Sequence, residues 1–127
     1  PQKHTVTQLA VIYLLALYIG EQLGKFTQEQ LSAYIAALEK LPEQIDEMLK
    51  HKENIQFFAS KYFNASDMYF IGRNVDYAAS LEASLKLKEI SYIHSEAYAA
   101  GELKHGPISL IEDGTLVIAL ATDDPPL

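Results

Sequence analysis

Apolar and polar positions follow a helical spacing through the first half of the chain. Residues 9–19 form an almost unbroken apolar run, which predicts a helix buried on most of its sides within a soluble protein. The run has about half of the ~20 residues that a membrane-spanning helix needs, so we expect no membrane span. Residues 26–50 place apolar side chains at three- and four-residue steps, which predicts an amphipathic helix, and residues 53–63 predict a third helix.

Capping and breaking residues refine the limits of these helices. Thr27, followed three residues later by Gln30, is a capping box, which predicts that the second helix begins there. Pro42 lacks a backbone N–H and predicts a break in that helix, with Pro42 in the first turn of a new one. The side of the third helix that we expect to be buried consists of four side chains: Ile55, Phe58, Ala59 and Tyr62.

The second half changes to short apolar runs separated by turns and by one long helix. Asp76 is expected to cap that helix, which extends over residues 77–93 because Leu, Ala, Lys and Glu dominate it. Strands that are joined through helices pair in parallel, so the pattern predicts an α/β layer fold. The expected strands are at residues 68–71, 95–98 and 116–121.

Parallel sheets of this kind bind ligands beyond the carboxyl ends of their strands. The predicted topology therefore places Gly72, Arg73 and Asn74, which follow the first expected strand, at such an end. The loop after Ala121 follows the third expected strand. We expect these two segments to lie at the edge of a ligand site.

The composition narrows the class of protein. The chain has 127 residues, a formal net charge of -7 and no cysteine. This length suits one domain or part of one, and we expect both ends to be cut from a longer chain. The negative charge argues against a nucleic acid or an anionic membrane as partner. Without cysteine these residues form no disulfide, thiolate zinc site or cysteine nucleophile, which suits a reducing compartment and favours the cytoplasm.

One cluster on the long predicted helix has the composition of a catalytic site. Glu82, Lys86 and Glu89 are separated by steps of four and three residues, which place them on one helix face. They are either a surface ion-pair ladder, worth ~0.3–0.5 kcal/mol per pair, or a carboxylate base beside a lysine that compensates developing negative charge. The spacing alone leaves both interpretations open.

The histidines do not form a metal-binding pattern. No two of them have the His-x-x-x-His spacing of a helical metal site, and no nucleotide-binding fingerprint is present, so we expect neither a metal nor another cofactor. His94 is expected to end the long helix. His105 differs because it lies in residues 101–107, a loop bounded by glycine and proline, and such loops often carry binding residues. A histidine that only braces its loop remains an alternative.

A longer stretch carries a specific resemblance. Residues 85–94, Leu-Lys-Leu-Lys-Glu-Ile-Ser-Tyr-Ile-His, are followed at residues 96–107 by Glu-Ala-Tyr-Ala-Ala-Gly-Glu-Leu-Lys-His-Gly-Pro. Together they closely resemble the isomerase half of the glutamine–fructose-6-phosphate aminotransferase (glucosamine-6-phosphate synthase) family. The resemblance covers roughly residues 8–121 and is strongest in the second half of the chain.

The resemblance implies a fold and a division of the chain. The family's isomerase half contains two sugar-isomerase (SIS) subdomains, each a flavodoxin-like parallel α/β sandwich. Residues 1–25 would be the closing helix of the first subdomain, and residues 26–127 the first part of the second. Within that second part, the resemblance places helices at residues 27–63 and the α/β portion at residues 67–127.

The resemblance also implies roles for three residues. Glu89 matches the glutamate that moves a proton between C1 and C2 of the sugar during ketose–aldose isomerisation. Lys86 matches the neighbouring lysine, which offsets charge on the enediolate. His105 matches the histidine that serves ring opening in the site of the neighbouring subunit. The implied ligands are fructose 6-phosphate and glucosamine 6-phosphate, and the implied assembly is a homodimer with a shared active site.

Several parts of that family's machinery lie outside these residues. They are the glutaminase domain, the loop that binds the sugar phosphate and the C-terminal lysine that forms the imine, so the chain alone is expected to be inactive. Where the family has Ser-Thr-Lys, this chain has Pro1, Gln2 and Lys3, so we leave Lys3 out of the site. The alternatives are another SIS-domain isomerase or deglycase acting on amino-sugar phosphates, and a non-catalytic SIS module that binds a sugar phosphate.

Overall fold

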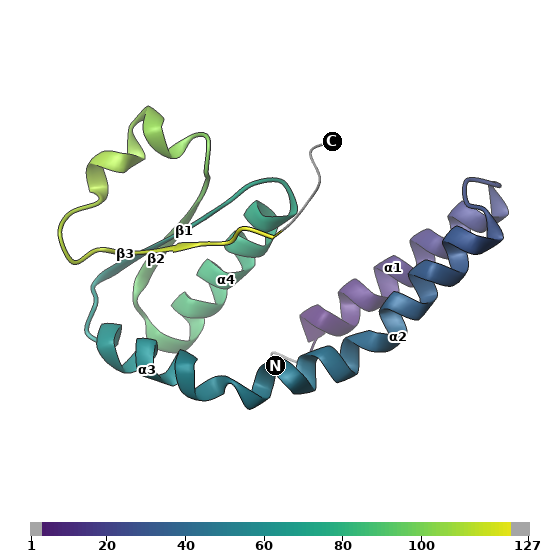
Figure 1. Ribbon diagram of the computed structural model, residues 1–127. Helices are drawn as coiled ribbons and strands as arrows, with labels where there is room; N and C mark the ends of the chain where they lie inside the picture. The colour runs from purple at the N-terminus through teal and green to yellow at the C-terminus, as the bar shows by residue number, and fades with distance from the viewer. Residues whose placement is uncertain (1–3, 123–127) are drawn as a thin grey trace. The chain divides into compact units, whose positions relative to one another are not determined.

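The computed structural model describes residues 4–122 (Figure 1). The chain divides into two compact units, Pro1–Ile55 and Gln56–Leu127, which are described separately. The elements in chain order are α1 (His4–Gln22), α2 (Gln28–Lys50), α3 (Lys52–Tyr62), β1 (Asp67–Gly72), α4 (Val75–Ser91), β2 (His94–Ala99), the 3-10 helices η1 (Leu103–His105) and η2 (Pro107–Leu110), and β3 (Leu116–Ala119).

The capping box at the start of α2 is confirmed, whereas the break at Pro42 is wrong. Thr27 Oγ1 accepts from the backbone N–H of Gln30 at 3.1 Å, and Gln30 Oε1 accepts from the backbone N–H of Thr27 at 2.9 Å. Pro42 lies inside a helix that continues to Lys50. The proline removes one hydrogen bond, but the residues on both sides of it are mostly strong helix formers, and these carry the helix through.

The prediction that the apolar run is buried on most sides is wrong for this chain. Val11, Tyr13 and Leu14 of α1 are exposed by 58%, 54% and 54%. α2 packs against α1 in the same unit, and one neighbouring helix can cover only one side of an apolar helix. Among residues 4–122, no helix combines the length and the apolar character that crossing a membrane requires.

The predicted buried side of α3 is also wrong. Ile55 and Phe58 are exposed by 66% and 58%, and α3 has no buried residue. No strand or helix within residues 56–122 packs closely against it, so its apolar side chains lack a surface to cover them.

The second unit contains the predicted parallel sheet. Three strands pair in the order β2-β1-β3, and both pairings are parallel. In this register Tyr69 of the central strand lies between Glu96 and Val117. Among residues 56–122, the buried apolar side chains are Met68, Tyr69 and Phe70. The α/β class predicted from the strand–helix order is therefore confirmed.

α4 packs on one face of the sheet through small polar residues. Ser84 Oγ donates to the backbone carbonyl of Ser95 at 2.9 Å, and Ser95 Oγ donates to the carbonyl of Ser84 at 2.8 Å. Both serines are buried. Because neighbouring residues of a strand point to opposite faces, His94 and Glu96 lie on the face away from α4.

The ends of α4 differ from the sequence-based prediction. Asp76 is not the N-cap, because the helix begins at Val75 and Asn74 occupies the cap position without a side-chain hydrogen bond. At the other end Tyr92 adopts a left-handed conformation (φ 61°), which stops the helix after Ser91. His94 therefore begins β2 instead of ending the helix.

Candidate functional site

The structure brings Glu82, Lys86 and Glu89 together on the exposed face of α4. Lys86 Nζ donates to Glu89 Oε2 at 2.7 Å and lies 3.6 Å from Glu82 Oε1. The lysine side chain is 30% exposed and that of Glu89 is 48% exposed. The hydrogen bond to Glu89 is the main cause that raises the pKa of Lys86 above its usual value. The arrangement is a solvent-accessible carboxylate held beside the ammonium group of a lysine whose charged form is favoured.

This cluster lies far from the carboxyl edge of the sheet. α4 begins just after the carboxyl end of β1, and β2 starts soon after α4 ends, with His94 paired to Asp67 at the amino end of β1. The helix therefore runs antiparallel to the strands. Glu89 comes fourteen residues after Val75, which at 1.5 Å per residue places it about 21 Å along the helix. The Lys86–Glu89 pair therefore does not lie at the sheet edge that the topology predicts as a ligand site.

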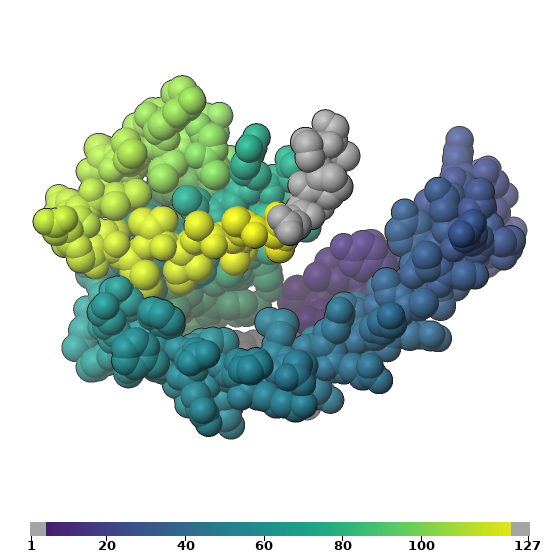
Figure 2. Space-filling view, in the orientation of Figure 1, coloured from purple at the N-terminus to yellow at the C-terminus, as the bar shows by residue number. Residues whose placement is uncertain are grey.

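His105 lies on the connection that leaves the carboxyl end of β2. It ends η1, its side chain is exposed, and its backbone N–H donates to the carbonyl of Glu102 at 2.9 Å. Figure 2 shows the segment between β2 and β3, in light green, at the outer surface of this unit. Within the described residues the imidazole of His105 has no side-chain partner. The chain thus places His105 and Glu89 towards opposite ends of the sheet and does not bring them together.

The carboxyl edge contains a polar pair that sequence reasoning missed. Asp76 is buried, and its carboxylate accepts from both the backbone N–H and the hydroxyl of Thr122. The two residues are 46 positions apart, and no motif links them. The contact could have been anticipated from the parallel pairing of β1 with β3, because this pairing places the residues that follow both strands at one edge of the sheet.

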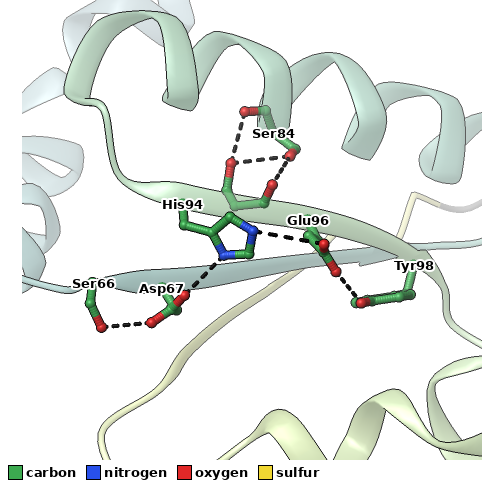
Figure 3. Close-up of polar contacts among 7 residues, drawn as sticks. Ser66, Asp67, Ser84, His94, Glu96 and Tyr98 are labelled. Carbon is green, nitrogen blue, oxygen red and sulfur yellow. Dashed lines mark hydrogen bonds and ion pairs between the residues drawn. The ribbon is translucent and has the colours of Figure 1, made fainter.

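A second polar network lies on the face of the sheet away from α4 (Figure 3). His94 Nδ1 lies 2.9 Å from Asp67 Oδ1, and His94 Nε2 lies 3.7 Å from Glu96 Oε1. Tyr98 donates its hydroxyl hydrogen to Glu96, and this hydrogen bond is the main cause that raises the pKa of Tyr98 to about 12. A hydrogen bond from Ser66, followed by the one to His94, lowers the pKa of Asp67.

The strand register explains this network. Asp67 and His94 are directly paired across β1 and β2, and His94, Glu96 and Tyr98 alternate along one face. The network links side chains of β1 and β2 across their pairing. Among residues 4–122, no group of three or more histidine, aspartate or glutamate side chains could hold a metal ion.

Comparisons with known proteins agree with this fold. Residues 61–125 match the model of the SIS domain family. The glutamine–fructose-6-phosphate aminotransferase [isomerizing] of Caldanaerobacter subterraneus subsp. tengcongensis is 52% identical over 122 residues, which are 96% of this chain and 20% of that protein. The enzyme of the same name from Clostridium tetani is 52% identical over 118 residues, or 93% of this chain and 19% of that protein.

A solved structure extends the agreement to three dimensions. The C-terminal domain of glucosamine-fructose-6-phosphate aminotransferase from Francisella tularensis superposes with a TM-score of 0.94 at 33% identity, covering 98% of this chain and 35% of that one. The chain spans about a fifth of the length of the curated relatives it matches. Both the resemblance and the flavodoxin-like parallel fold expected from it are confirmed. The chain belongs to the SIS domain family.

Proposed function

We propose that this chain is part of the isomerase domain of a glucosamine-6-phosphate synthase. The whole enzyme would convert fructose 6-phosphate and glutamine-derived ammonia to glucosamine 6-phosphate. The matched relatives are named glutamine–fructose-6-phosphate aminotransferase [isomerizing] and are 52% identical over nearly the whole chain. The observation that carries the proposal is the 2.7 Å hydrogen bond between Lys86 and the exposed carboxylate of Glu89.

Glu89 is the proposed base of the ketose–aldose step. It would take a proton from C1 of the sugar and return it to C2, passing through an enediolate. The positive charge of Lys86 would offset the negative charge that develops on the sugar oxygens. Its raised pKa supports this role, because the hydrogen bond to Glu89 favours the charged form of the lysine. The carboxylate accounts for the carbon-bound proton that moves from C1 to C2, while a second proton must leave the C1 hydroxyl and another must reach the heteroatom at C2.

His105 is proposed to serve ring opening in the site of a second copy of the chain. The distance along α4 supports this, since Glu89 lies about 21 Å from the helix start and His105 follows the opposite edge of the sheet. A homodimer would bring His105 of one copy to Glu89 of the other. Histidine is a common proton donor and acceptor in enzyme sites, which suits a role in ring opening.

The remaining parts of the proposed enzyme lie outside this chain. They are the glutaminase domain, the sugar-phosphate loop and the tail lysine, and without them the chain alone would be inactive. We further propose that residues 1–25 close the first SIS subdomain, that residues 26–127 begin the second, and that the enzyme is cytoplasmic. The atypical residues Pro1, Gln2 and Lys3 lie outside the described residues.

The role of Glu89 is tested in the full-length protein by Glu89→Gln. We expect this variant to lose exchange of the transferred sugar proton while glutamine hydrolysis persists. Glu82→Gln is the matched control, because Glu82 contacts the same lysine at the longer distance of 3.6 Å and is not the proposed base. It should keep most of the isomerisation. Isomerisation by Glu89→Gln at the wild-type rate would refute the assignment.

A second candidate function has one observation in its favour. The structure of a glucosamine-6-phosphate deaminase from Thermotoga maritima superposes with a TM-score of 0.56 at 27% identity over 87% of this chain. An amino-sugar-phosphate deaminase or deglycase would need no glutaminase domain. The full gene separates the two functions, because only the synthase would encode that domain.

A further inference from the structure

Asp76 and Thr122 meet at the place where the order of the strands reverses. β1 leads through α4 to β2 on one side, whereas β3 pairs with β1 on its other side. Doubly wound sheets bind ligands in the crevice outside the carboxyl ends of the strands at such a switch point. A ligand here would lie between the beginning of α4 and the chain that leaves β3.

At this edge of the sheet the chain's own groups bond to one another. The backbone N–H of Thr122 donates to Asp76 Oδ2 at 2.9 Å, and Thr122 Oγ1 donates to Asp76 Oδ1 at 2.8 Å. Both carboxylate oxygens are therefore engaged, and Asp76 is only 8% exposed. The N–H of Leu120 also donates to the carbonyl of Ile71 at 2.9 Å. The segment after β3 is thus held to both β1 and α4.

The Asp76–Thr122 contact disfavours binding of a phosphorylated ligand at this edge, because it occupies the space and because Asp76 carries negative charge. Asp76 lies in the first turn of α4, where the helix dipole favours its negative charge. A phosphate in the crevice would displace Thr122 and then lie close to this carboxylate, and like charges at short range repel. Gly72 allows so close an approach of α4 that a Cβ there would lie 2.4 Å from the carbonyl carbon of Asp76.

We propose that the Asp76–Thr122 pair is an internal latch that occupies the switch point of this sheet and excludes the sugar phosphate from it. The latch fixes the segment after β3 against the beginning of α4. The reacting sugar then meets this chain at the other end of α4, at Lys86 and Glu89. The exclusion of the sugar rests on the proposed function, whereas the latch itself does not.

Hydrogen exchange of the Thr122 amide in the full-length protein tests the latch. Asp76→Ala should speed this exchange by about ten- to a hundredfold, the factor that a hydrogen bond to a charged group represents. Thr122→Val removes only the hydroxyl donor and should give a smaller increase. Asp113→Ala is the control, because it makes the same charge change at the exposed turn before β3 and should leave the exchange unchanged. An unchanged rate in folded Asp76→Ala would overturn the latch.

The exclusion of the sugar phosphate is tested by kinetics of the same variants. Thr122→Val should keep the KM for fructose 6-phosphate within about twofold of the wild type, because the substrate does not enter the crevice. A change of KM by tenfold or more, with an unchanged melting temperature, would overturn the exclusion. If the wild-type protein does not turn over fructose 6-phosphate, the proposed function fails, and the exchange experiment still decides whether the latch exists.

Discussion

Replacing Gly72 by alanine is expected to destabilise the second unit by about 3 kcal/mol, at the upper end of the usual cost of overpacking. An added Cβ would lie 2.4 Å from the carbonyl carbon of Asp76, 2.5 Å from its oxygen and 2.7 Å from the backbone nitrogen of Tyr77. All three are backbone atoms, so no side chain can rotate away. The start of α4 would have to retreat from β1 by about 1 Å to restore ordinary contact distances.

Calorimetry of the full-length protein measures this effect in the unfolding transition of the isomerase domain. A loss of about 3 kcal/mol lowers the midpoint by roughly 6–12 °C for a domain of ordinary size. Gly101→Ala is the matched control, because a Cβ at Gly101 meets no atom within 4 Å. That variant should stay within about 0.5 kcal/mol of the wild type. Equal midpoints for the two variants would refute the close approach of α4 to β1.

Three further outcomes follow from the structure. Lys86→Met should lower kcat for isomerisation by about a hundredfold, as loss of a charge-stabilising group does, whereas the exposed neighbour Lys88→Met should have little effect. Asp67 has a lowered pKa in the folded state, so its stabilising effect is present above its ordinary pKa of 3.8 and disappears as the pH falls through the folded value. Asp67→Asn should therefore melt below the wild type at pH 7, with the difference vanishing in acid. The chain alone, supplied with ammonia and fructose 6-phosphate, should form no glucosamine 6-phosphate in a product assay.

The sequence predicted the capping box and the parallel sheet, but it did not predict which helix faces are covered. The capping box at Thr27 needs only a three-residue spacing, and the parallel sheet follows from the order of strands and helices. The break predicted at Pro42 was wrong because the helix-forming residues around the proline outweigh the free-energy cost of placing it in a helix. The exposure of the apolar run in α1 could not be predicted, because burial depends on which segments cover a helix.

In the candidate site, too, contacts within one helix could be predicted from the sequence, whereas a contact between distant segments could not. The contact of Lys86 with Glu82 and Glu89 follows from helical spacing, and the structure contains it. The spacing could not exclude a surface ladder, and the exposure of these side chains is compatible with both interpretations. Asp76 was expected at a helix cap because aspartate favours that position, but its partner Thr122 is 46 residues away, beyond the reach of a local pattern.

The measurement that tests the account most directly is complementation between two inactive full-length variants. Glu89→Gln and His105→Ala are mixed under conditions in which subunit exchange is verified, and synthase activity is measured. If each site combines Glu89 of one copy with His105 of the other, a heterodimer has one site with both lesions and one with neither. We expect such a shared site to restore about half the wild-type activity per heterodimer. No recovery after verified exchange would contradict it, because every site would then retain one lesion.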